Sequence, residues 1–205
     1  MVDGGRTTLL CCGTILLIIA AIGVFGSARA SLSYVIYHGA KFTPPRRHER
    51  PEAAARRCEA AHRLYPHNYY MCIWIAEKCW YARYDIDGSE SADRVALAAK
   101  WCDRGLALNT RKSQLRLLKT RLLAKHSLRD AIAEWKAYVD WHFWEPHNHA
   151  VLVGLYAEAG DFAEAARSLE WVKGSKHYAE AHRKLQEAWR KEILRPAIPP
   201  VRPQP

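Results

Sequence analysis

The chain has 205 residues, of which 49% are hydrophobic and 25% charged, and this composition excludes a disordered polypeptide. Its 8 tryptophans and 10 tyrosines supply enough large side chains for a well-buried helical core. The net charge of +10 is spread along the sequence, so it does not define a separate basic domain. The length suits one core with additional segments.

The first predicted element is an apolar helix over residues 7–28, after a short tail of residues 1–6. The run from Thr7 to Ala28 holds 22 residues and no charge. A helix of that length spans about 33 Å, which is enough to cross the hydrocarbon core of a bilayer. The run therefore predicts a single-pass transmembrane anchor.

A cleaved signal peptide is the alternative for the same run. Arg6 precedes it, and Ala28-Arg29-Ala30 places small residues at the −3 and −1 positions of a cleavage site. The run is longer than an ordinary signal core, which favours the anchor. A lipoprotein signal is excluded because Cys11 stands at the start of the run and not after it.

The charges that flank the run give conflicting indications of topology. One basic residue precedes it, and five follow closely: Arg29, Lys41, Arg46, Arg47 and Arg50. The positive-inside rule would therefore keep the rest of the chain in the cytoplasm. A short tail with one arginine before an apolar run is also the layout of an export signal, and long domains cross membranes largely regardless of flanking charge. We expect the domain to be extracytoplasmic.

A juxtamembrane spacer is predicted over residues 29–50. Tyr34, Tyr37 and Phe42 lie among basic residues there, a composition that suits the lipid headgroup region. Pro44-Pro45 interrupts any continuous helix. A linker whose aromatic residues are incidental is the alternative.

Residues 51–194 have helical periodicity almost throughout, with no alternating run of strand length, and this predicts an all-α domain. The clearest unit covers residues 147–172. Leu152 and Tyr156 lie on one face of its first helix, which Gly160 ends. Phe162 and Ala165 lie on one face of its second helix.

This unit resembles the tetratricopeptide repeat, a 34-residue helix-turn-helix motif. The matching residues are Leu152, Tyr156, Gly160, Asp161, Phe162 and Ala165, whereas His149 and Val153 depart from the motif. The same pattern recurs 34 residues earlier, where Leu128 and Ala131 align with Phe162 and Ala165. Leu115, Leu118, Leu122 and Trp135 take the other positions of that second unit.

A third unit begins near Trp74 and ends near Asn109, with Tyr81, Ala98 and Cys102 in place and a lengthened turn at residues 85–91. Residues 51–66 resemble a lone second helix, and residues 175–193 a capping helix. The resemblance implies a right-handed stack of helical hairpins over residues 51–194. Residues 195–205 form a Pro-rich tail.

The resemblance also implies a binding groove lined by the first helices of the repeats. Carried onto this chain, its positions are Cys72, Ile75, Cys79, Ala82 and Arg83 in the first unit, Ser113, Arg116, Thr120, Leu123 and Ala124 in the second, and His147, Ala150, Gly154, Ala157 and Glu158 in the third. The groove lacks the Lys, Asn and Arg set with which chaperone-binding repeats hold a terminal carboxylate.

No catalytic motif, metal site or cofactor site is predicted, so we do not expect an enzyme. His142, His147 and His149 are the tightest histidine group, but only Glu145 is near enough to add a ligand. The four domain cysteines would be core residues in a reducing compartment and could form disulfides in an oxidising one: Cys58, Cys72, Cys79 and Cys102.

The expected function is a membrane-tethered scaffold that binds a protein or peptide partner through this groove. Two alternatives remain open. One is a structural subunit of a larger membrane complex. The other is an electrostatic binder of acidic ligands through the basic residues of 111–129, which are Arg111, Lys112, Arg116, Lys119, Arg121, Lys125 and Arg129. No specific nucleic-acid partner is expected.

Overall fold

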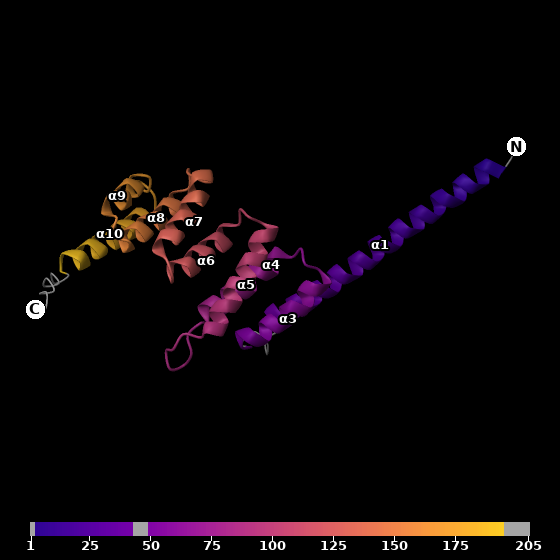
Figure 1. Cartoon of the computed structure of the whole chain (residues 1–205), viewed down its shortest axis with the longest axis horizontal. Coiled ribbons are helices and arrows are strands. Elements are labelled where there is room, and N and C mark those ends of the chain that lie inside the picture. The colour runs from indigo at the N-terminus through magenta and orange to yellow at the C-terminus, as the bar shows by residue number, and fades with distance from the viewer. Residues whose placement is uncertain (1–2, 43–48, 195–205) are drawn as a thin grey trace, which may run out of the picture. The chain divides into compact units, whose positions relative to one another are not determined.

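The computed structural model describes residues 3–42 and 49–194, with side chains described from Cys12 onward. Within these ranges the backbone forms nine α-helices and no β-strand, as the periodicity predicts (Figure 1). The chain divides into two compact units, Met1–Thr110 and Arg111–Pro205, each of which is described by itself. The predicted Pro-rich tail lies outside the described residues.

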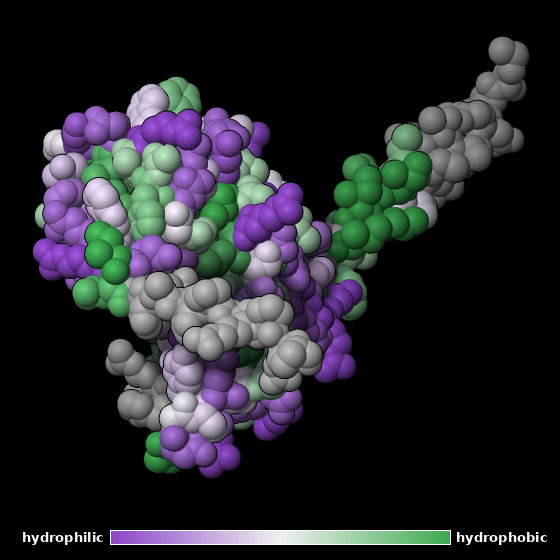
Figure 2. Space-filling view, turned by 60° about the vertical axis from the view of Figure 1, so that its left-hand side comes forward, coloured by the Kyte–Doolittle hydropathy of each residue, from purple (hydrophilic) through white to green (hydrophobic). Residues whose placement is uncertain are grey.

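The first helix of unit 1, α1, runs from Asp3 to Phe42. Its large apolar side chains between Ile15 and Phe25 are exposed, and the span Cys12–Phe42 is long and apolar enough to cross a membrane. Figure 2 shows these hydrophobic side chains in green, in contrast to the hydrophilic surface that predominates elsewhere in that view. Burying such a surface in lipid removes the cost of exposing it to water.

The end of α1 differs from the expected spacer, because the chain stays helical from residue 29 to Phe42. Ser33, Tyr37 and Ala40 recur at helical spacing and are buried where α1 packs against the next helix, α3. The Ser33 hydroxyl donates a 2.8 Å hydrogen bond to the carbonyl oxygen of Ala61. This tertiary packing makes the segment part of unit 1, and Pro44-Pro45 lies outside the described residues.

Helix α3 spans Pro51–Leu64 and begins with a proline, which the first turn of a helix tolerates. The sequence predicts it as a lone second helix, but the structure pairs it with the end of α1. The Glu59 carboxylate receives hydrogen bonds of 2.7 and 2.9 Å from the Arg104 guanidinium. These bonds lower the pKa of Glu59 to about 2.

The remaining helices of unit 1 are α4, Tyr69–Tyr81, and α5, Ala92–Leu108, which pack together as a hairpin. The Asn68 side chain caps α4 by accepting a bond from the Met71 amide. The long turn between the helices follows the predicted insertion, and Gly88 supplies its positive φ of 81°.

Unit 2 contains five helices, which are α6 (Ser113–Ala124), α7 (Leu128–Trp141), α8 (Pro146–Glu158), α9 (Phe162–Glu170) and α10 (Tyr178–Ile193). Helix α8 packs against α7, α9 and α10. The core between them includes Trp135, Val153 and Val172, all almost fully buried. Ser127 and Asp161 cap α7 and α9 where the sequence predicts each second helix to begin.

The hairpins α4–α5, α6–α7 and α8–α9 therefore form over the predicted ranges. Their arrangement as one continuous right-handed stack stays a prediction.

The repeat register predicts that Ala165 lies where two helices touch most closely, and its side chain is fully buried. Ala165→Leu should destabilise the protein by about 1–3 kcal/mol through overpacking. Ala163→Leu, two residues earlier on the exposed side of α9, should change stability little. Thermal melts of the full chain in detergent measure both variants, and equal melting temperatures would contradict the register.

Candidate binding groove

Three of the five groove positions predicted in unit 1 are fully buried. The side chains of Ile75 and Cys79 have no exposed surface, and neither does that of Cys72 on the same face of α4. Arg83 is half-buried and engaged, because its guanidinium lies 4.0 Å from the Trp80 ring centre and pairs with Glu90 at 3.1 Å. The prediction that Ile75 and Cys79 line an open groove is therefore wrong, whereas the role predicted for Arg83 stays a prediction.

Packing of α3 against α4 explains the burial. Cys58 of α3 is close enough to Cys72 and Cys79 for their thiolate charges to affect it. Burial, reinforced by those two charges, raises the pKa of the Cys58 thiol to about 12. Burial also raises the pKa of Cys79 to about 12 and that of Cys72 to about 11. The sequence interpretation as small core residues agrees with these free, buried thiols.

These raised pKa values predict unreactive thiols in the folded protein, because only the thiolate attacks alkylating reagents. In a variant with Cys11→Ala and Cys12→Ala, iodoacetamide at pH 8 should leave Cys58, Cys72 and Cys79 unmodified. The same reagent should modify them once the protein is unfolded in denaturant. Peptide mass spectrometry measures both states, and rapid modification in the folded protein would contradict the packing.

Three predicted groove residues of unit 2 also belong to its interior or its ion pairs. Thr120 is 1% exposed, and Leu123 packs against the core. Arg116 of α6 pairs with Glu134 of α7, and both side chains are largely covered. The expected groove therefore does not extend along α6 beyond its first residue, Ser113, which is exposed.

The predicted residues of α8 do line open hollows. His147, Ala150, Gly154 and Glu158 follow one another at helical spacing along the side of α8 that meets α10. The first hollow has a volume of about 270 Å³ and is lined by His147, Ala150, Val151, His177, Glu180, Ala181 and Lys184. The second has about 510 Å³ and is lined by Gly154, Ala157, Glu158, Gly160, Phe162, Lys184, Glu187, Ala188, Lys191 and Glu192.

Lys184 borders both hollows, so we treat them together as the α8–α10 groove. A third hollow of about 370 Å³ adjoins it at His147 and is lined by Ser113, Tyr138, His142, Trp144, Glu145, His147 and Asn148. Ser113, His147, Ala150, Gly154 and Glu158 thus each line at least one of these three hollows in unit 2.

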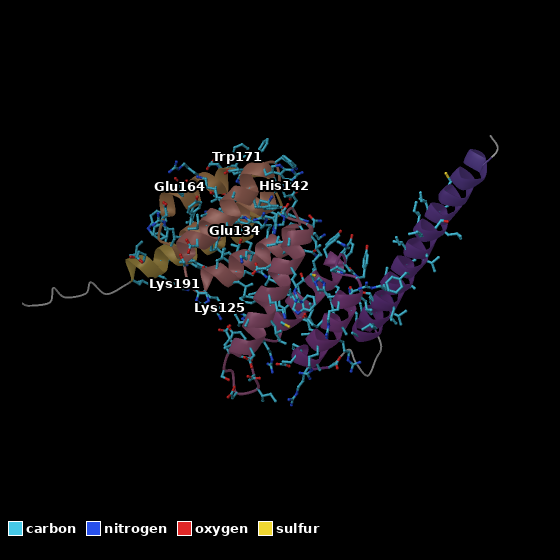
Figure 3. The ribbon with its side chains drawn as sticks, turned by 45° about the vertical axis from the view of Figure 1, so that its right-hand side comes forward. Lys125, Glu134, His142, Glu164, Trp171 and Lys191 are labelled. Carbon is cyan, nitrogen blue, oxygen red and sulfur yellow. The ribbon has the colours of Figure 1, made fainter. Side chains whose placement is uncertain are left out.

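Small side chains and charges of both signs characterise the α8–α10 groove. Gly154 lies in mid-helix, and a Cβ atom built on it would meet nothing within 4 Å. Lys184 pairs with Glu180 at 2.9 Å, while Lys191 stands near the end of α10 (Figure 3). The groove can therefore receive a segment with modest apolar side chains flanked by charged ones.

The imidazoles of His147 and His177 face each other across the groove, with ring centres 5.1 Å apart. Burial lowers the pKa of His147, and the charge of protonated His177 lowers it further. Glu145 and Glu180 oppose this shift, and Arg121 adds to it.

The lowered pKa predicts that acid destabilises unit 2. The unfolded chain binds a proton at His147 near pH 6.5, whereas the folded chain does so only at lower pH, so stability falls as the pH drops below about 6.5. His147→Gln should reduce the loss of melting temperature between pH 7.5 and 5.5. Since 1 kcal/mol corresponds to about 4–8 °C in a unit of this size, calorimetry can resolve the difference. The same loss in both proteins would contradict this role.

The histidines around the turn between α7 and α8 have aromatic and backbone partners. The His149 ring stacks on Trp171 at 5.2 Å, and its Nε2 atom lies 2.6 Å from the carbonyl oxygen of Phe143. His142 packs between Tyr138 and Trp144. Among the described residues, no group of three or more His, Cys, Asp or Glu side chains could hold a metal ion.

Part of the basic segment 111–129 is engaged within unit 2. Arg116 pairs with Glu134, and the Arg111 guanidinium lies 3.7 Å from the centre of the Trp141 ring. The ion pair with Glu134 offsets the charge of Arg116, whereas the ring contact leaves the charge of Arg111 in place.

Sequence reasoning missed the contribution of α10, which forms the opposite wall of the groove with Lys184, Glu187 and Lys191. Its apolar positions Ala181 and Leu185 indicate the face that packs on α8, so the residues beside them could have been assigned to the groove.

Comparison with known proteins identifies no relative, because no family model matches the chain and no curated protein is similar to it.

Proposed function

We propose that this protein is a membrane-tethered scaffold that holds a protein partner in the α8–α10 groove of a tetratricopeptide-like stack. The apolar helix α1 supplies the tether. The helical hairpins supply a rigid frame, since each buries its apolar face against a neighbour.

One observation carries the proposal: four residues that the repeat register assigns to a partner surface border open hollows along α8. They are His147, Ala150, Gly154 and Glu158. Small residues at such positions leave room for the side chains of a partner. Because the register depends on the sequence alone, the position of these four residues beside the hollows supports the proposal.

The partner segment is expected to be a peptide or helix with small apolar anchors. Ala157 and Ala188 provide an apolar lining, and Glu158, Lys184 and Lys191 provide charges at the edges. Such a combination orients a segment by its charges and stabilises it by apolar burial.

Filling the groove at Gly154 tests the proposal without removing any contact of the fold. Gly154→Leu should lower partner capture at least about tenfold, the effect of losing roughly 1.4 kcal/mol of binding. The melting temperature should not fall, because replacing a mid-helix glycine raises helix propensity. Capture is measured by crosslinking in native membranes, purification of the full chain and quantitative mass spectrometry.

Two further variants make the comparison specific. Gly154→Ala should give an intermediate loss of capture, since it adds only one methyl group to the groove. Ala163→Leu places a leucine on the exposed surface of unit 2 outside the groove, and this variant should retain the partner. If Gly154→Leu captures the same proteins in the same amounts as the unaltered chain, the groove is not the partner surface.

A further inference from the structure

Unit 2 exposes an aromatic patch that the groove does not use. It consists of Trp141 at the end of α7, Phe143 and Trp144 in the turn that follows, and Trp171 at the end of α9. Their exposed fractions are 44%, 53%, 61% and 59%. Exposed aromatic surface of this extent marks an interaction site, because leaving it in water is costly.

Contacts inside unit 2 hold the patch together. The His149 ring lies nearly parallel to Trp171, and its Nε2 atom lies 2.6 Å from the Phe143 carbonyl oxygen. The Phe143 and Trp144 rings meet edge to face at 5.4 Å. Figure 3 shows His142 and Trp171 on the same side of the unit. The aromatic rings are therefore fixed in place, and little ordering is needed for them to bind.

A positively charged side chain, that of Arg111, lies against the aromatic rings of the patch. The Arg111 guanidinium stacks on Trp141 with 3.7 Å between its carbon and the ring centre. Glu145 is the acidic residue of the same turn, beside Trp144. Tryptophan combined with arginine is the composition found where proteins meet lipid headgroups.

We propose that the aromatic patch inserts into the headgroup region of the bilayer in which α1 is anchored. The proposal rests on that anchorage and not on the groove. Tethering by α1 keeps the patch at high effective concentration near lipid, so that even weak insertion is populated. The net charge of +10 favours anionic headgroups.

Tryptophan fluorescence of the full chain in vesicles tests this proposal. None of the 8 tryptophans lies in α1, so the emission reports only on the helices that follow. Trp80, Trp101 and Trp135 are buried, whereas Trp141, Trp144, Trp171 and Trp189 are exposed. The vesicles contain equal parts of phosphatidylcholine and phosphatidylglycerol, with or without bromine on the acyl chains near the headgroups. Washing with alkaline carbonate first confirms that the chain is anchored.

Brominated lipid should quench about a third of the emission, in proportion to the three patch tryptophans among the eight. Replacing Trp141, Trp144 and Trp171 together by Phe should abolish most of the quenching. Phe preserves the aromatic surface, and circular dichroism and melting temperature verify the fold. Trp189→Phe, which removes the exposed tryptophan of α10, should leave the quenching unchanged.

The proposal is overturned if brominated lipid quenches no emission while aqueous iodide quenches the patch, because the patch then faces water or a protein partner. It is equally overturned if the triple Phe variant is quenched as strongly as the unaltered chain. Gly154→Leu should be quenched like the unaltered chain, so the result separates this proposal from the groove.

Discussion

Close approach of helices at alanine is the packing constraint on which both units depend. Every described helix but α6 contributes at least one buried alanine, and the set includes Ala40, Ala61, Ala76, Ala98, Ala131, Ala157, Ala165 and Ala181. A side chain of one carbon lets backbones approach and brings larger neighbours such as Trp101 and Trp135 into contact around it. In α8 small side chains have another effect, because Ala150 and Gly154 leave the side toward α10 open.

The groove and the aromatic patch share unit 2 but differ in their chemistry. The groove is a hollow with small residues and paired charges, whereas the patch projects rigid rings beside an arginine. His147 and its neighbours in the turn after α7 connect the two regions, since His147 lines hollows with Lys184 on one side and with Trp144 on the other. A scaffold that holds a partner and touches lipid with the same unit would place that partner close to the bilayer.

The sequence alone predicts the helices of the three hairpins, because apolar residues that recur at 3.6-residue spacing and the break at Gly160-Asp161 are local signals. It does not predict the end of α1, where Ser33, Tyr37 and Ala40 lie among apolar residues that would suit lipid equally well. Burial of Ile75 and Cys79 also escapes the register, since it depends on α3 packing against them. The register agrees with the structure at α8 because α10 leaves that side of α8 partly open. No local pattern in the sequence distinguishes the open face of α8 from the covered face of α4.

The apolar turns of α1 and the turns that pack on α3 belong to one unbroken helix, which couples the orientation of the apolar turns to that of the packed ones. A helix of 40 residues extends about 60 Å, well beyond the hydrocarbon core of a bilayer, and its last turns are fixed to α3 by Ser33 and by the bond from Arg29 to the Arg63 carbonyl oxygen. Bilayers of different thickness tilt a spanning helix by different amounts. If α1 spans the bilayer as we propose, its unbroken course from the spanning turns to the turns packed on α3 would make the packed helices of unit 1 rotate with that tilt, and membrane thickness would set their angle to the bilayer.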